Sequence, residues 1–341
     1  MQESVEPETQ LTEMATSTTD PTTFSSVEIR VRGRSILVPS VTIDGRTVVV
    51  TGNLLKLASV RDEDLWQGET VSEPRDFVSQ LREYGLRADL FTFAQRIPDT
   101  RKQYDFYTEW SNDAALPVST YDHWLKKQVG YSTRKAVNKS QKMGVIARRV
   151  DFDDNFVRAI CRVYAESPTR QGRAFWHYNK GFEAVKHELG TYLDRSVFIG
   201  TYFENELIGS LKMTYVGPTA SIMQIFCSQN HFDKRPNNAL IAKAVEICEQ
   251  DNKSHLIYGN FTYHDVDSSL TEFKRRNGFE PVLLPRYYLP LTLKGSLALR
   301  LGLHRGLVGC IPPPVLKKLR DVRAKWYARQ SKQSTSVQQQ N

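Results

Sequence analysis

The order of elements predicted between residues 145 and 292 constrains the fold more than any other feature of this sequence. Alternating apolar and polar residues predict strands, and apolar residues three or four positions apart predict helices. These patterns give the order strand, helix, helix, three strands, helix, strand, helix, strand. The segments are 145–152, 153–170, 181–195, 196–216 (two strands joined by a polar turn at Glu204 and Asn205), 221–228, 234–252, 255–261, 267–279 and 280–292. An α+β domain is therefore expected over residues 145–292.

A second, smaller α/β domain is predicted before it, at residues 27–120. Its helix carries Ser72 as the expected N-cap and Pro74 in the first turn. The segments are a strand at 27–39, a β-rich stretch at 47–60, the helix at 72–86 and a strand at 88–98. Two domains agree with the length of 341 residues, since one domain usually holds roughly 100 to 200.

The segment between the two domains is predicted to be a basic helical connector at residues 121–144. Lysine and arginine recur along it, and Gly144 ends it as a glycine C-cap would. The ends of the chain, residues 1–26 and 331–341, are polar and poor in apolar side chains, so we expect disordered tails there.

Composition excludes some classes of protein and leaves others open. The sequence has no apolar run long enough to span a bilayer, and its acidic, Ser/Thr-rich start is unlike a secretory signal, so a cytoplasmic location is expected. The cysteines, Cys161, Cys227, Cys248 and Cys310, lie far apart and predict neither a disulfide framework nor a structural metal site. The net charge of +8 favours anionic partners, which include nucleic acid, a membrane surface, a phosphorylated cofactor or an acidic substrate.

Two sequence segments suggest a family. The segment order, with FIGTYFENELIGSLKMTYV leading to a helix and then FKRRNGFEPV, resembles the GNAT acyltransferase superfamily. LTEFKRRNGFEPV and the basic stretch YDHWLKKQVGYSTRKAVNKSQKMGV resemble the Fem-type aminoacyltransferases and the CelD-like or BioF-type acetyltransferases. The resemblance implies a mixed, mostly antiparallel sheet flanked by helices, built as two GNAT-like domains of which the first, 27–120, is degenerate.

The resemblance also implies an acyl-CoA binding loop at the start of the helix at 234–252. In GNAT proteins backbone N–H groups at this helix start hold the cofactor pyrophosphate. Here the place falls on Lys234, Arg235, Asn237 and Asn238, and Arg275 extends the positive charge. Asn238 and Leu240 stand where the superfamily has small residues, so Asn237 and Asn238 as simple helix caps stay an alternative.

Lys274 is the first candidate for a catalytic residue. The superfamily's usual tyrosine acid, four residues before a glycine, is replaced here by Lys274, and in Fem-type relatives the matching lysine acts electrostatically. An ordinary exposed lysine in the basic run 274–276 is the alternative. His264 and Asp265 are candidates for a general base, with Asp233, Glu166 and ordered water as further options.

The end of the chain, residues 293–330, is expected to form amphipathic basic helices. Val315, Leu319, Val322 and Trp326 share one face of the last helix, and basic residues cover the others. This pattern is compatible with contact to a membrane surface or to tRNA, or with docking on the enzyme body.

The sequence therefore predicts an N-acyltransferase that moves an acyl group, acetyl first, from acyl-CoA to a small-molecule or peptide amine acceptor, without a metal. A Fem-type enzyme that uses aminoacyl-tRNA is one alternative. A non-catalytic protein that binds nucleic acid or membrane through basic surfaces is another.

Overall fold

Twelve strands form one continuous, mostly antiparallel sheet in the computed structural model, which describes residues 25–31, 34–63, 71–170, 173–263 and 267–305. The strand order is β1-β2-β3-β4-β5-β14-β6-β13-β12-β11-β10-β7. These strands are β1 (Ser25–Val31), β2 (Arg34–Ile43), β3 (Arg46–Thr51), β4 (Leu57–Val60), β5 (Leu90–Ala94), β6 (Tyr107–Pro117), β7 (Ile146–Val150), β10 (Ser196–Phe203), β11 (Glu206–Val216), β12 (Thr219–Cys227), β13 (His255–Asn260) and β14 (Glu280–Pro290).

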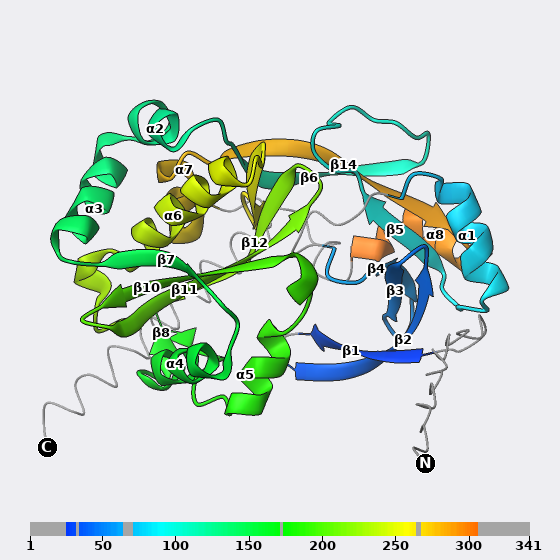
Figure 1. The fold of residues 1–341 in the computed structure, drawn as a ribbon. Coiled ribbons are helices and arrows are strands. Elements are labelled where there is room, and N and C mark those ends of the chain that lie inside the picture. Colours follow the sequence, from blue (N-terminus) through cyan, green and yellow to red (C-terminus); the bar gives the residue numbers. More distant parts are fainter. Residues whose placement is uncertain (1–24, 32–33, 64–70, 171–172, 264–266, 306–341) are drawn as a thin grey trace, which may run out of the picture.

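Helices lie on both sides of this sheet, and a two-stranded hairpin lies apart from it (Figure 1). The helices are α1 (Pro74–Glu83), α2 (Tyr121–His123), the π-helix η1 (Trp124–Gln128), α3 (Tyr131–Lys142), α4 (Asp154–Ala165), α5 (Phe182–Leu189), α6 (Pro236–Gln250), α7 (Ser269–Arg276) and α8 (Leu293–Arg300). Short 3-10 turns are η2 (Leu193–Arg195), η3 (Phe232–Lys234) and η4 (Leu303–Arg305), and the hairpin is β8 (Thr169–Arg170) with β9 (Arg173–Ala174).

The same strand pattern occurs twice in the sheet. The first half of the sheet contains β1 to β5, and the second half contains β7 and β10 to β13. In each half, two strands pair in parallel over a short stretch and a helix connects them. These are β4 and β5, connected by α1, and β12 and β13, connected by α6. The other strand pairs within the described ranges are antiparallel. Both connecting helices begin with proline at the first position, where the missing N–H costs nothing. This repetition fits two related halves.

The two halves exchange strands at the centre of the sheet. β6, from the first third of the chain, pairs with β13 of the second half, and β14, from the end, pairs with β5 of the first half. β6 and β14 pair with each other along most of their lengths. Each half therefore needs a strand from the other part of the chain to complete its sheet.

Three apolar clusters stabilise this arrangement. One lies around α6 and includes Trp124 and Phe279, which are fully buried. Another surrounds α1 and the stacked rings of Phe77 and Phe91. The third lies between the helices α4 and α5 and the face of the second half that points away from α6, and it includes the buried Phe198. In Figure 1 the second half accordingly lies between α6 and α3 on one side and α4 and α5 on the other.

The predicted element order from 145 to 292 is confirmed, with β8 and β9 as an addition to it. The α+β class with a mixed, mostly antiparallel sheet is confirmed as well. The polar turn between β10 and β11 is also confirmed, since Glu204 and Asn205 both have positive φ, as hairpin turns with matching twist require.

Three local predictions were wrong. The N-cap of α1 is Glu73 and not Ser72, because Pro74 occupies the first helical position and sets the residue before it as the cap. β1 starts at Ser25, inside the predicted tail 1–26, because Ser25 pairs with Ser40 of β2. The helix predicted over 181–195 ends at Leu189, and Tyr192 has a left-handed backbone that no helix continues through.

Other predictions fall on residues that the structure does not describe. They concern the tail at 1–24, the tail at 331–341 and the amphipathic helix with Trp326, which lies within 306–341. Among the described helices, none combines the length and the apolar character needed to cross a membrane.

Candidate functional site

The parallel strands β12 and β13 separate shortly after they begin. Their pairing runs from Thr219 with His255 to Ser221 with Ile257. β12 then continues to Cys227 against β11 alone, with an extra residue, Met223, at a register shift. β13 pairs along its other edge with β6, from His255 with Pro117 to Asn260 with Asp113, and keeps this partner after its pairing with β12 has ended. The result is a parallel pair that opens at its carboxyl end, with an irregularity at the opening of the kind common beside active sites.

The chain from the open end of β12 leads directly to the start of α6. Arg235 is the N-cap, with a left-handed backbone (φ 59°), and Pro236 is the first helical residue. The side-chain oxygen Oδ1 of Asn237 is buried without a hydrogen-bond partner. Nδ2 of Asn238 lies 3.5 Å from Oδ1 of Asn277, which ends α7. Asn237 and Asn238 therefore do not serve as caps, and Asn238 instead connects the start of α6 to the end of α7.

Lys274 is the most unusual side chain of this region, because it is fully buried. It lies on α7, whose other charged residues face solvent, and its exposed fraction is zero. Nζ donates a hydrogen bond to the backbone oxygen of Asn260, at the end of β13, over 2.5 Å. Lys274 is therefore not an ordinary exposed lysine of the run 274–276, and its ammonium group lies where β13 leaves β12.

Aromatic rings and a carboxylate surround this ammonium group. Nζ lies 4.7 Å from the ring centre of Tyr258 and 5.0 Å from that of Tyr263, distances at which a cation is attracted to a ring face. Burial lowers the pKa of Lys274 to about 8, and the charge of the buried Asp113 opposes part of that decrease. A lysine with such a pKa is largely charged at neutral pH and loses its proton just above it.

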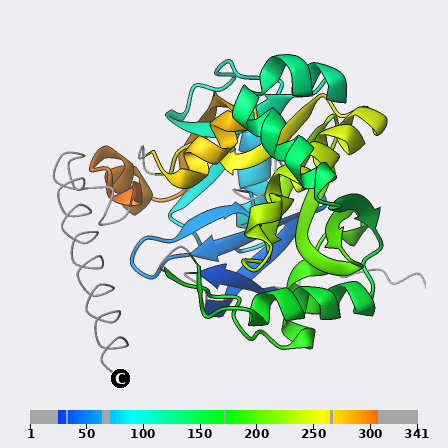
Figure 2. The ribbon, with the colours of Figure 1, turned by 90° about the vertical axis from the view of Figure 1, so that its left-hand side faces the viewer.

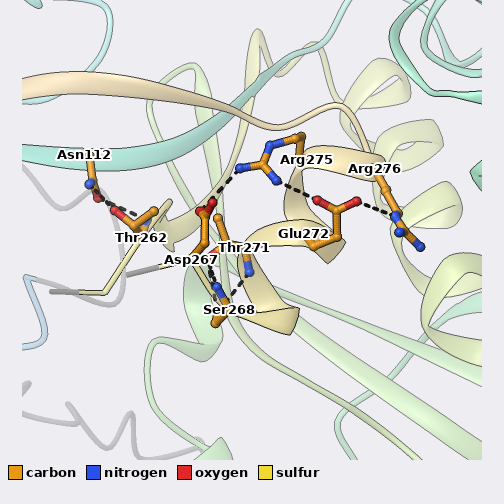
Figure 3. Close-up of polar contacts among 8 residues, drawn as sticks. All are labelled: Asn112, Thr262, Asp267, Ser268, Thr271, Glu272, Arg275 and Arg276. Carbon is orange, nitrogen blue, oxygen red and sulfur yellow. Dashed lines mark hydrogen bonds and ion pairs between the residues drawn. The ribbon is translucent and has the colours of Figure 1, made fainter. Parts of the chain in front are cut away.

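Hydrogen bonds hold the described residues at the end of β13 and at the start of α7, as Figure 3 shows. Asn112 of β6 donates from Nδ2 to the hydroxyl of Thr262 over 2.6 Å. On the other side, Ser268 and Thr271 form a reciprocal capping box at the start of α7. Tyr263, which contacts Lys274, belongs to the segment between β13 and α7, so the segment helps to define the surroundings of the ammonium group.

Arg275 is bound to two acidic neighbours, Glu272 on its own helix and Asp267 just before that helix. Its guanidinium contacts Glu272 at 2.6 Å and Asp267 at 3.4 Å, as seen in Figure 3. Glu272 also pairs with Arg276 at 2.6 Å. These two arginines are half or more exposed and partly neutralised, so they contribute less field to an anion site than the sequence indicated.

The remaining candidate site residues lie near the start of α6, beside the backbone of Gln229, or outside the residues that the structure describes. Lys234 lies 3.5 Å from Asp233 and over the ring of Phe203, and Arg235 is exposed. Glu166 accepts a hydrogen bond from the backbone N–H of Gln229. His264 and Asp265 lie outside the described residues. In the described ranges, no group of three or more His, Cys, Asp or Glu residues is arranged to hold a metal ion.

Sequence reasoning missed the residues that surround Lys274. Asp113 lies about 160 positions before it in the chain, and no pattern in the segment around Asp113 indicates a site. Tyr258 and Asn260 belong to a predicted strand in which they are ordinary members. The pairing of β6 with β13 places Asp113 opposite Asn260, whose backbone oxygen accepts the hydrogen bond from Lys274.

A second buried lysine provides a comparison. Lys212 of β11 has its pKa lowered to about 8 by burial, and its Nζ donates to the backbone oxygens of Leu189 and Thr191. These carbonyls end α5 and begin the segment before β10, so Lys212 holds that segment in place.

A surface groove of about 560 Å³ lies elsewhere, in the first half, lined in part by Leu37, Lys56 and Arg87.

Solved structures with the same fold exist at low sequence identity. FemX superimposes with a TM-score of 0.51 at 10% identity, over 81% of this chain and 90% of FemX. L-PGS from Bacillus licheniformis superimposes with a TM-score of 0.50 at 15% identity, over 75% of this chain and 85% of that one. No protein-family model and no curated protein matches the sequence. The resemblance to Fem-type proteins is thus confirmed at the level of the fold.

Proposed function

We propose that this protein is an acyltransferase that moves an acyl group from acyl-CoA to an amine acceptor. The observation that carries the proposal is the opening of β12 and β13 in front of the start of α6. An extended thioester donor needs a slot between strands for its arm and positive charge at the slot's outer end for its phosphates. We infer that the arm enters the opening between β12 and β13, and that Lys234 and Arg235 supply the charge.

Lys274 takes the catalytic role in this proposal. Attack of an amine on a thioester carbonyl develops negative charge on the carbonyl oxygen, and a buried cation stabilises that charge more than an exposed one does. The ammonium group lies at the end of β13, beside the opening. The amine loses its proton to a base or to water, and the thiolate leaves with a proton.

An aminoacyl-tRNA is the second candidate for the donor, and one observation favours it. Pro236 has no N–H, and the N–H groups of Asn238 and Ala239 donate to the oxygen of Arg235. The start of α6 therefore offers fewer backbone donors to a pyrophosphate than a glycine-rich loop would. The two donors share the acyl-transfer chemistry at Lys274 and differ in what binds at Arg235.

The test is a thermal-shift titration with acetyl-CoA, longer acyl-CoAs and free CoA. A ligand that binds only the native protein at about 100 times its Kd adds about 2.7 kcal/mol to the free energy of unfolding and raises Tm. Arg235→Ala removes the guanidinium while keeping a Cβ at this left-handed position, so the backbone strain stays the same. Arg82→Ala, an exposed arginine on α1, is the matched control.

We expect acyl-CoA to raise Tm of the wild type and of Arg82→Ala, and to raise Tm of Arg235→Ala much less. Stabilisation by an aminoacyl-tRNA and by none of the CoA ligands would replace the first donor with the second. Absence of turnover with either donor, together with salt-sensitive RNA binding, would refute acyl transfer and favour a non-catalytic protein.

A further inference from the structure

α8 exposes a row of leucines along one face. Leu293, Leu297 and Leu301 are spaced four residues apart, which places them on the same side of the helix, and they are 91%, 57% and 61% exposed. Leu303 follows at 49%, and Leu54, in the loop between β3 and β4, is 86% exposed. Leu54 lies beside α8, since Nζ of Lys294 donates to its backbone oxygen. Leucines gathered in this way mark an interaction surface more often than single exposed ones do.

The opposite face of α8 is fixed to the body of the protein. Gly295 packs so closely on the backbone of Asp89 that a Cβ would lie 2.0 Å from its oxygen. Thr292 caps the helix and also donates to Asp89, and Lys294 forms an ion pair with Asp89 at 3.1 Å. The leucine row is therefore presented outward by an anchored helix, and does not result from a helix that has lost its contacts.

The segment after α8 is held to β6. Oε1 of Glu109 accepts from Nε2 of His304 at 2.8 Å and from Nε of Arg305 at 2.7 Å. These contacts lower the pKa of the Glu109 carboxyl, against the effect of its burial. Figure 2 shows α8 and η4 (orange-brown) at the periphery of the molecule, away from the centre of the sheet.

The positive charge of the protein is concentrated in the same part of the chain. Of the 46 basic and 38 acidic residues in the sequence, residues 293–341 hold ten basic ones and one acidic one, Asp321. The other 292 residues are nearly balanced, with 36 basic and 37 acidic residues. The net charge of +8 thus comes entirely from the part of the chain that starts with the leucine row.

From these observations we infer that the leucine face of α8 (Leu293, Leu297 and Leu301), together with the neighbouring exposed Leu303 and Leu54, docks on an anionic lipid bilayer. Apolar side chains enter the interface between headgroups and acyl chains, while lysine and arginine beside them are attracted to the negative surface. Both components are present on this part of the chain. This docking is independent of the proposed acyl transfer and brings the protein to the membrane as a peripheral protein.

Charge and apolar surface together favour an anionic bilayer over the other partners that this face could bind, which are a second copy of the chain and RNA. Residues 306–341 carry seven basic residues and one acidic residue, so the excess of positive charge continues along the chain after η4. A second copy of the chain, paired through the same face, would bring like charges together. RNA would satisfy the charge but would leave the leucines in water. An anionic bilayer satisfies both.

Vesicle flotation with the full-length chain tests the inference. The vesicles are phosphatidylcholine alone, and phosphatidylcholine mixed with phosphatidylglycerol. The variant Leu293→Ser/Leu297→Ser/Leu301→Ser removes apolar surface from exposed positions, so its fold is retained. Ile146→Ser/Leu283→Ser, which changes two exposed apolar residues on β7 and β14, is the matched control. Tryptophan fluorescence with brominated lipid, on Leu297→Trp, measures insertion at α8 itself.

We expect the wild type and the control to bind the anionic vesicles and to bind phosphatidylcholine weakly. The triple variant should bind the anionic vesicles roughly tenfold or more weakly, because three apolar contacts are lost. Leu297→Trp should show quenching by brominated lipid beyond that of the wild type. Equal binding of the triple variant, absence of this added quenching, a dimer that the triple mutation dissociates, or binding to RNA and not to vesicles would each overturn the inference.

Discussion

The hydroxyl of Tyr192 donates a hydrogen bond of 2.8 Å to Oδ2 of Asp62, across 130 positions of the sequence. Asp62 follows β4 in the first half, and Tyr192 precedes β10 in the second. Both have left-handed backbones, with φ of 57° and 55°. For a bulky residue such as tyrosine this conformation is strained, and surrounding contacts must maintain it. The contact therefore links the two halves away from the central exchange of strands.

Tyr192→Phe should lower the free energy of unfolding by about 1 to 2 kcal/mol. The reason is that a hydrogen bond to a carboxylate contributes more than one between neutral groups. Chemical denaturation followed by fluorescence measures the change. Tyr131→Phe, at a tyrosine that is 73% exposed, is the control and should have no measurable effect. A loss as small as that of Tyr131→Phe would mean that the contact contributes nothing to stability.

Lys274→Met should lower kcat by roughly two to three orders of magnitude, the usual loss when a group that stabilises an oxyanion is removed. Donor binding, measured by thermal shift, should change little, because the proposed phosphate contacts lie at Lys234 and Arg235. Lys212→Met is the matched control, since Lys212 is also buried and also has a pKa of about 8. If both variants lose the same activity, the loss reflects the removal of a buried lysine and not catalysis.

The rate should fall as the pH rises through about 8. Lys274 stabilises negative charge only while it is protonated, and burial lowers its pKa to about 8. The measurement is kcat at saturating acceptor, so that ionisation of the free amine does not enter. Lys274→Arg keeps its charge throughout this range, so whatever activity it retains should not fall there. A wild-type rate that stays constant or increases above this pH would contradict an electrostatic role.

Asp113→Asn should move this inflection to lower pH. The carboxylate of Asp113 raises the pKa of Lys274 against the effect of burial, so its neutralisation removes that opposition. Glu109→Gln is the control on the same strand, because the Glu109 carboxylate binds His304 and Arg305. The pH profile of each variant gives the result. An inflection that moves upward, or that moves equally in both variants, would refute the assignment of Asp113.

The sequence by itself determined the elements and their order. The alternation in 196–216, the turn at Glu204 and Asn205, and the apolar face of 153–170 are local patterns. The backbone follows them because the helix forms its hydrogen bonds within itself and the hairpin forms them between its two strands. Lys274 was also accessible from sequence, through the resemblance to Fem-type proteins. Its burial was not, since the basic run around it is typical of an exposed helix.

The tertiary structure decided what surrounds Lys274 and which face of α8 meets solvent. Asp113 lies near this lysine because β6 pairs with β13, and such long-range pairing leaves no periodic signal in either segment. The sequence left open whether the helices predicted at 293–330 contact a membrane surface, tRNA or the enzyme body. The leucines of α8 are exposed because Gly295 and Thr292 fix the other face of the helix on Asp89, and this orientation turns the leucines toward solvent.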